Sequence, residues 1–227
     1  MTNKVSGPLP PQGGGTGPGS ECEAGAVRGQ KMDERLRWFG DYFFRPFLWA
    51  FEGLRISPNL ITCLGMALAV LCGYLLSEGL VPLAAVMFAL SGVLDLVDGY
   101  IAKKLDKVTV FGSFLDSFSD RVSDAAMCLG LTVYYLRLSE GVYVGLSLVV
   151  LVLSFLISYV RARAEGLGVA CKAGLMVRSV RLLLLGAALF FNGLSPWVLR
   201  GALWLMAVLL AETLVQRLLE VWRSLRR

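Results

Sequence analysis

The sequence predicts an all-α, polytopic membrane protein with six transmembrane helices and an N-terminal amphipathic helix at the membrane interface. Hydrophobic residues make up 56% of the chain and the mean hydropathy is +0.65, which exceeds the usual range of soluble domains. Six apolar stretches each approach the length of about 20 residues that crosses a hydrocarbon core. Short polar connections separate these stretches, so successive spans are expected to alternate in direction.

Two segments precede the predicted spans. Residues 1–31 are rich in glycine and proline and contain no apolar run, which predicts a disordered tail and not a signal peptide. In residues 32–56, aromatic and leucine side chains recur at helical spacing with charged residues between them. This pattern is typical of an amphipathic interfacial helix, although a soluble helix packed on the protein would show it too. Residues 57–227 are the expected six-helix transmembrane domain.

The basic residues predict the orientation of the spans. The spans are expected at residues 59–76, 81–102, 112–136, 142–160, 174–191 and 196–216. Lysine and arginine gather at the even connections and at both ends of this region, whereas the odd connections hold only Arg137, with Arg200 nearby. Because cytoplasmic loops carry the excess of positive charge, we expect both termini and both basic connections on the cytoplasmic side of a cell membrane.

Composition narrows the possible chemistry. Histidine is absent, which removes imidazole as a base or metal ligand. The five cysteines are scattered, mostly in apolar runs, as expected of buried thiols in a reducing compartment. A net charge of +5 suits an anionic membrane surface. Neither zinc-finger spacing nor an aromatic and basic platform is present, so no nucleic-acid partner is expected.

Acidic residues interrupt the second and third spans, where carboxylates are costly. Asp95 and Asp98 lie one helical turn apart, as do Asp116 and Asp120, so each pair shares one helix face. Four carboxylates on neighbouring helices need a counter-charge, and an oxygen-only set suits Mg²⁺, Mn²⁺ or Ca²⁺ better than Zn²⁺. Two ions would fit and would suit phosphoryl transfer. A structural ion-pair cluster or an ion pathway is the alternative.

Small residues accompany the carboxylates and complete a known motif. Gly99, Ala102 and Gly112 would let a ligand approach the helices closely. The pattern D-x2-D-G-x2-A-R-x8-G-x3-D-x3-D is the signature of CDP-alcohol phosphotransferases, which this sequence resembles over residues 32–220. Lys103 stands where that family usually has arginine, which keeps the charge but loses the bidentate fork. The stretch Ser57–Thr62 also resembles the family's entry to its first span.

The resemblance implies a reaction and a set of site residues. An alcohol attacks a CDP-linked lipid, which gives a phosphodiester and CMP. The resemblance makes Asp120 the general base, and a homodimer is the implied assembly. The four aspartates implied to bind two Mg²⁺ or Mn²⁺ ions are Asp95, Asp98, Asp116 and Asp120. The residues expected to bind the CDP-lipid are Asn59, Thr62, Gly99, Ala102, Lys103 and Gly112.

A second basic region predicts a phosphorylated acceptor. The segment 158–181 resembles the inositol-phosphate branch of the family, which makes phosphatidylinositol phosphate or archaetidylinositol phosphate. Its cations predict a phosphate pocket, although the positive charge also serves topology. The expected phosphate ligands are Arg163, Lys172, Arg178 and Arg181. Glycerol phosphate is the alternative acceptor, a transporter is the alternative of another class, and the lipid tails are diacylglycerol or archaeol.

Overall fold

A computed structural model describes residues 57–104, 109–169, 174 and 176–226, with the backbone alone at Pro58 and 100–104. These residues form six α-helices and no β-strand, which confirms the all-α class. The expected tail at 1–31 and interfacial helix at 32–56 lie outside the described residues. The helices are α2 (Pro58–Ser77), α3 (Val81–Lys104), α4 (Val110–Arg137), α5 (Gly141–Gly166), α6 (Arg178–Phe191) and α7 (Pro196–Leu225).

Three helices depart from the predicted bounds, each for a local reason. α5 continues to Gly166 and α7 to Leu225, because helix-forming arginine, alanine and leucine extend both helices beyond the purely apolar runs. α6 begins only at Arg178, because Gly174 has φ +125° and Val177 is extended. The extra turns of α5 carry Arg161 and Arg163 past the apolar run.

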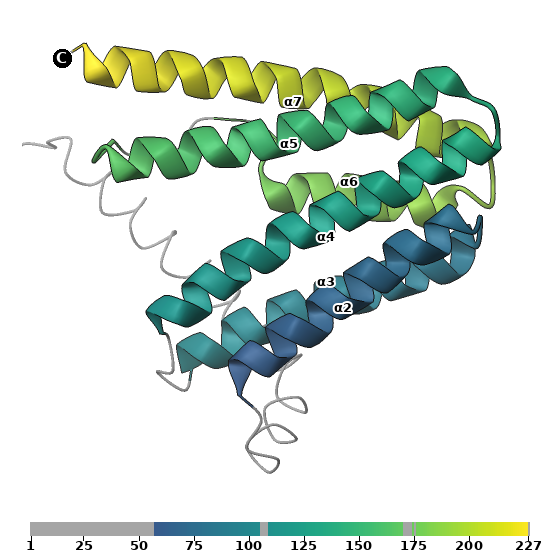
Figure 1. Cartoon of the computed structure of the whole chain (residues 1–227), viewed down its shortest axis with the longest axis horizontal. Coiled ribbons are helices and arrows are strands. Elements are labelled where there is room, and N and C mark those ends of the chain that lie inside the picture. The colour runs from purple at the N-terminus through teal and green to yellow at the C-terminus, as the bar shows by residue number, and fades with distance from the viewer. Residues whose placement is uncertain (1–56, 105–108, 170–173, 175, 227) are drawn as a thin grey trace, which may run out of the picture. The chain divides into compact units, whose positions relative to one another are not determined.

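Helix pairing brings the two acidic helices together. α2 packs most extensively against α3 and α4. α4 also packs against α5, and α5 packs against α7. α6 joins α3 to α7. In Figure 1, the start of α2, α4 and α6 and the end of α3, α5 and α7 lie on the same side of this bundle. The carboxylates of α3 and α4 are therefore at one end of the helices.

Glycines allow α2 and α4 to cross in backbone contact. A Cβ atom at Gly73 would overlap the carbonyl group of Ala126, and one at Gly130 would overlap the backbone of Gly73. Small residues at helix interfaces permit such close approach within membranes. This crossing fixes the separation of α2 and α4 about two to four turns along α4 from Asp116 and Asp120.

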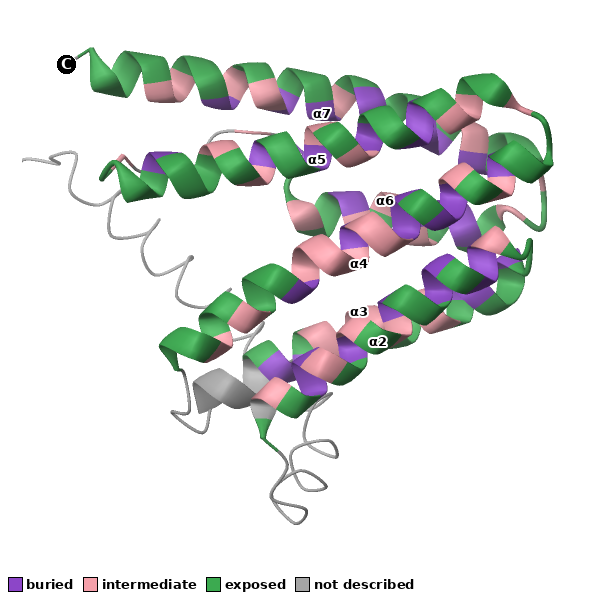
Figure 2. Cartoon of the chain, viewed as in Figure 1, coloured by how far each residue is buried: buried purple, intermediate pink, exposed green. Residues whose placement is uncertain are grey.

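The tightly packed core lies away from the acidic end. Figure 2 shows the buried residues gathered toward the α2–α3 and α4–α5 turns. Leu76, Leu131, Tyr135, Leu199 and Leu203 are all at most 1% exposed there. Toward the acidic end, by contrast, Phe111, Phe114 and Tyr159 are exposed. The structure therefore combines a closed end that holds the helices with an open end that carries the polar residues.

Two ion pairs fasten the closed end. Arg137 donates two hydrogen bonds of 2.9 Å to Glu78, and these bonds lower the pKa of Glu78 below its ordinary value. The pair therefore contributes stability above the ordinary carboxyl pKa and loses it as the pH falls through the lowered one. Arg200 of α7 binds Glu140 at the α4–α5 turn and lies over the ring of Trp197, 4.9 Å from its centroid. Both arginines at this end are thus neutralised.

Four of the described helices are long and apolar enough to cross a membrane. They are α2, α3, α5 and α7, by length and composition. α4 has the length, at 28 residues, but carries too many charged side chains, and α6 has only 14 residues. The structure therefore supports a multi-pass membrane protein.

The α2–α4 crossing gives a test of the fold. We expect Gly73→Ala to lower the thermal unfolding temperature in detergent markedly, since the new methyl group meets backbone and the helices must separate; overpacking of this kind costs about 1–3 kcal/mol or more. Gly145→Ala is the matched control, because that α5 glycine faces open space. Alanine there should be neutral or slightly stabilising. Equal unfolding temperatures for the two variants would contradict the backbone contact.

Candidate functional site

α3 presents its two carboxylates to α2 and to the site. Asp98 is 5% exposed and accepts a 2.5 Å hydrogen bond from the hydroxyl of Thr62 on α2. Asp95, one turn earlier, is half-buried. Gly99 follows with nothing within 4 Å of the position that a Cβ would take. α3 therefore offers one oriented carboxylate, one more accessible carboxylate and an open backbone surface.

α4 begins with a cap that brings its first turn against α2. The hydroxyl of Thr109 accepts a 2.9 Å hydrogen bond from the Gly112 amide. A Cβ at Gly112 would lie 2.9 Å from that hydroxyl and 3.2 Å from the Asn59 Oδ1 atom, so only glycine fits without a shift. From this start the helix carries Asp116 and Asp120 to the same level as Asp95 and Asp98.

Three of the four predicted metal ligands meet. One carboxylate oxygen from each of Asp95, Asp98 and Asp116 lies within 4.8 Å of the other two. Such a cluster of hard oxygen ligands fits a divalent cation of the Mg²⁺ or Mn²⁺ type, since like charges this close need a counter-charge. Asp120 lies outside this set of three, and we call the four aspartates together the carboxylate cluster.

Arg178, the first residue of α6, bridges the carboxylate cluster. Its Nη1 atom donates a 2.7 Å hydrogen bond to Asp95, and its Nη2 atom lies 2.7 Å from Asp120 Oδ1. The second contact lacks hydrogen-bond geometry, so Asp120 Oδ1 is buried without a hydrogen-bond partner. The Arg178 Nε atom is also buried without one. One guanidinium thus connects α3, α4 and α6 with part of its bonding capacity unused.

A second ion pair lies one turn deeper. Arg181 is 5% exposed and donates a 2.5 Å hydrogen bond to Asp124, which is 9% exposed. Removing one partner of such a buried pair typically costs about 3–5 kcal/mol. This pair fixes the start of α6 against α4 and so sets the height of Arg178. Asp124 follows Asp120 by one further helical turn in the sequence, which does not reveal Arg181 as its partner.

The backbone before α6 is held by α7. The Met176 amide donates a 3.0 Å hydrogen bond to the Thr213 hydroxyl, and Arg217 donates one of 2.9 Å to the Ile157 carbonyl of α5. A Cβ at Gly174 would lie 2.6 Å from the Thr213 methyl group. Sequence analysis missed Thr213 and Arg217. In the sequence, Thr213 is a polar residue within an apolar run, and Arg217 is a charged residue just after that run. These two departures from the apolar pattern could have indicated them.

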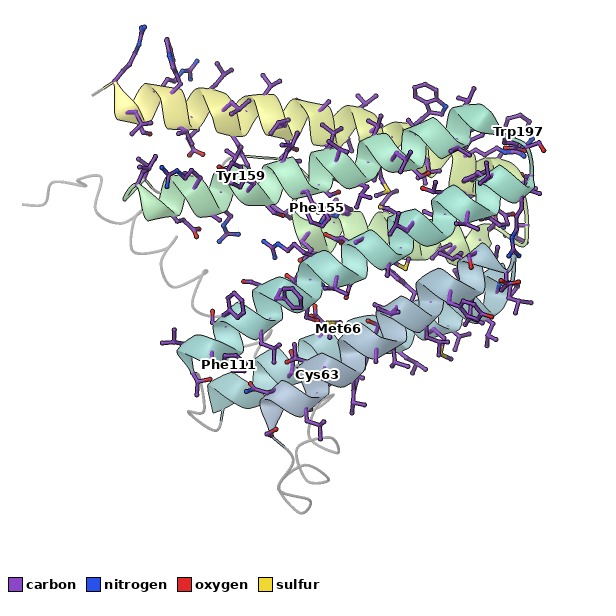
Figure 3. All side chains as sticks on the ribbon, viewed as in Figure 1. Cys63, Met66, Phe111, Phe155, Tyr159 and Trp197 are labelled. Atoms are coloured by element: carbon purple, nitrogen blue, oxygen red, sulfur yellow. The ribbon has the colours of Figure 1, made fainter. Side chains whose placement is uncertain are left out.

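A small internal cavity lies beside the carboxylate cluster. Its volume is about 50 Å³, which leaves room for a few water molecules. Its polar lining consists of Thr62, Ser91, Asp95, Asp98, Ser119, Ser123 and Arg178. Met66, labelled on α2 in Figure 3, belongs to its apolar wall. The cavity is too small to hold a nucleotide or a lipid.

The predicted phosphate ligands lie in different environments. Arg163 is exposed near the end of α5, and neighbouring Arg161 is paired with Glu165 at 2.9 Å. Arg178 and Arg181 are brought to the aspartates of α3 and α4, and Arg181 is buried there. Lys172 and the side chains of Ala102 and Lys103 lie outside the described residues.

Known proteins resemble this chain over most of its length. Residues 55–220 match the family CDP-alcohol phosphatidyltransferase. Archaetidylinositol phosphate synthase of Methanothermobacter thermautotrophicus is 34% identical over 193 residues, which cover 81% of this chain and 94% of that protein. Phosphatidylinositol phosphate synthase of Corynebacterium glutamicum is 35% identical over 175 residues, which cover 75% of this chain and 80% of that protein.

Solved structures of a phosphatidylinositol phosphate synthase also resemble this chain. The crystal structure of Mycobacterium tuberculosis phosphatidylinositol phosphate synthase with CDP-DAG bound superposes with a TM-score of 0.72 at 30% identity, covering 78% of this chain and 92% of that one. The same enzyme in complex with manganese and citrate gives a TM-score of 0.72 at 30% identity, covering 78% of this chain and 88% of that one.

These comparisons confirm the family expected from the motif. The match to the family includes all residues from Asp95 to Asp120, and three of its aspartates meet in the structure. Relatives and solved structures point to the same group of enzymes. This chain belongs to the CDP-alcohol phosphatidyltransferase family.

Proposed function

We propose that this protein is an integral membrane transferase that moves a phosphatidyl-type group from a CDP-linked lipid to inositol 1-phosphate and releases CMP. The observation that carries the proposal is the carboxylate cluster of α3 and α4 bridged by Arg178 at the open end of the helices. Relatives named as inositol phosphate lipid synthases favour this acceptor over glycerol phosphate, and they favour a transferase over a transporter.

The chemistry is a displacement at phosphorus. A hydroxyl oxygen of the acceptor bonds to the lipid-linked phosphorus, the bond from that phosphorus to the bridging oxygen breaks, and CMP leaves. Asp120 is proposed to accept the hydroxyl proton, as the resemblance implies; its Oδ1 atom contacts Arg178 but accepts no hydrogen bond. Two Mg²⁺ or Mn²⁺ ions held by Asp95, Asp98, Asp116 and Asp120 would neutralise the diphosphate when bound.

The donor is proposed to bind beside α2 and the acidic helices. Gly99 leaves its surface open, and Gly112 keeps Asn59 close to α4, which supports a cytidine or diphosphate contact there. Thr62 orients Asp98 through its hydrogen bond. Ala102 and Lys103 complete the proposed CDP-lipid site.

The acceptor phosphate is proposed to bind among the cations near the start of α6. Arg178 lies in the first turn of α6, where the helix dipole favours an anion and no acidic residue of its own is present. Arg163 and Lys172 are proposed to add charge from the end of α5 and the following segment. Arg181 is bound to Asp124, and we propose that it contributes by holding α6 in place.

We further propose that the site faces the cytoplasm. Among the described residues, Arg137 and Arg200 are the arginines at the opposite end, whereas arginines are more numerous at the end that holds the site. This supports the charge asymmetry on which orientation depends. Six spans then require that α4 and α6 also cross, with their charged residues turned inward.

A homodimer is the proposed assembly, as the family resemblance implies. An open apolar groove between α4 and α5 offers a surface for a second copy. Figure 3 shows two of its residues, Phe155 and Tyr159, on α5. Cross-linking in native membranes would test this assembly, and an exclusively monomeric species would contradict it.

The function can be tested by release of labelled CMP. Purified protein with CDP-diacylglycerol or CDP-archaeol and Mg²⁺ should release CMP with inositol 1-phosphate, and excess EDTA should abolish release. Glycerol 3-phosphate and free inositol are the competing acceptors and should support at most slow release. Equal or faster release with glycerol 3-phosphate would overturn the acceptor, and no release with any acceptor would overturn the transferase activity.

Asp120→Asn tests the proposed base. We expect turnover to fall by about 10²–10⁴-fold or more, because loss of a positioned base removes that much and the same residue is a proposed metal ligand. Binding of the CDP-lipid should persist. Glu165→Gln, which removes an exposed negative charge at the same end, should retain near-normal CMP release. Near-normal release by Asp120→Asn would refute the assignment.

Arg163→Ala tests the acceptor pocket. If Arg163 binds the acceptor phosphate, the KM for inositol 1-phosphate should rise by about 10-fold or more, since a charge-assisted hydrogen bond contributes about 1.5–3 kcal/mol. The KM for the CDP-lipid should change little. Arg161→Ala is the matched control, because Arg161 is already paired with Glu165. An unchanged acceptor KM would favour a topological role for Arg163.

A further inference from the structure

Arg178 occupies a position between the residues that are proposed to hold metal. Its two terminal nitrogens each lie 2.7 Å from a carboxylate oxygen, one on Asp95 and one on Asp120. Asp95 is also a member of the set of three whose oxygens converge within 4.8 Å. The same Asp95 carboxylate thus serves both a guanidinium and the candidate metal centre.

A guanidinium and a divalent cation compete for such ligands. Each neutralises the carboxylate cluster, and two cations a few ångströms apart repel each other strongly where water is scarce. In the described arrangement, Arg178 also holds Asp120, which lies outside the converging set of three. Binding of a metal ion by all four aspartates therefore requires Arg178 to give up at least part of its contacts.

The contacts of Arg178 are suited to release. The Nε atom is buried without a hydrogen-bond partner, and the approach to Asp120 Oδ1 lacks hydrogen-bond geometry. The side chain is 28% exposed, so it has a path toward the open end. Arg181 differs, because it is 6% exposed at its side chain and paired with Asp124, which lies outside the motif. Arg178 can therefore move while Arg181 keeps α6 in place.

We propose that Arg178 is the resident counter-cation of the carboxylate cluster and that its guanidinium leaves Asp95 and Asp120 when a divalent ion binds. This inference rests on the proposed function, because it assumes the metal site. It adds a positioning role: Arg178 holds Asp95 of α3 and Asp120 of α4 together before a metal ion binds, and afterwards its charge is available to an incoming phosphate. Metal binding and completion of the acceptor site are then linked through one side chain.

The test is the affinity of the purified full chain for Mn²⁺ alone, measured from the electron paramagnetic resonance signal of the free ion. Removal of a competing cation should tighten binding, so we expect Arg178→Gln to bind Mn²⁺ at least about tenfold more tightly than the parent. Arg121→Gln is the matched control. Arg121 lies 3.4 Å from Asp120, is also bonded to the Ser117 carbonyl, and does not contact the set of three. Its loss should tighten binding by about threefold or less.

Two further measurements keep the test decisive. Arg178→Lys retains the charge but not the fork, so its Mn²⁺ affinity should lie between those of the parent and Arg178→Gln. In EDTA, Arg178→Gln should unfold at a lower temperature than the parent, and saturating Mn²⁺ should narrow that difference. If the variant does not survive EDTA, its affinity can be measured by chelator competition from the Mn²⁺-bound form.

The outcomes separate this inference from the proposed function. Unchanged or weaker Mn²⁺ binding by Arg178→Gln, in a parent that binds Mn²⁺, would overturn the exchange and leave the metal site intact. Equal tightening in Arg178→Gln and Arg121→Gln would also overturn it, since any nearby charge would then suffice. A parent that binds no Mn²⁺ would overturn both the exchange and the metal centre.

Discussion

Mutual repulsion among the carboxylates of α3 and α4 is the main constraint on the polar end of this protein. Charges this close cannot remain ionised without cations or hydrogen-bond donors. Thr62 donates to Asp98, Arg178 reaches Asp95 and Asp120, and a divalent ion fits where three carboxylates converge. The helices that supply these partners, α2 and α6, are the ones that pack on α3. The packing of α2 and α6 on α3 therefore brings in the partners that compensate this charge.

The closed end makes that arrangement possible. Gly73 and Gly130 let α2 and α4 touch through their backbones, and the ion pairs of Glu78 and Glu140 fasten the turns beyond them. The apolar core is concentrated at the same end. The other end, by contrast, carries the acidic residues beside exposed aromatic side chains such as Phe111 and Phe114. Transfer between a membrane-bound donor and a soluble acceptor needs such a boundary position.

Much of the site could be predicted from the chain alone because its key residues are local in sequence. Asp95 and Asp98 share a helix face by spacing, as do Asp116 and Asp120, and the family motif spans both helices. The partners of Arg181 and Met176 could not be predicted in this way. Asp124 and Thr213 are 57 and 37 residues from them, and only packing brings such residues together.

The sequence by itself determined the helical class, the apolar runs, the acidic motif and its family, since periodicity and spacing act within one or two helices. Only the tertiary structure decided which carboxylate each arginine of α6 pairs with. Arg178 and Arg181 are three residues apart and look equivalent in the sequence, yet Arg178 bridges Asp95 and Asp120, whereas Arg181 is buried with Asp124. That difference depends on the depth at which α6 meets α3 and α4. That depth is set by the Arg181–Asp124 pair and by the contacts of Gly174 and Met176 with Thr213, which no local pattern encodes.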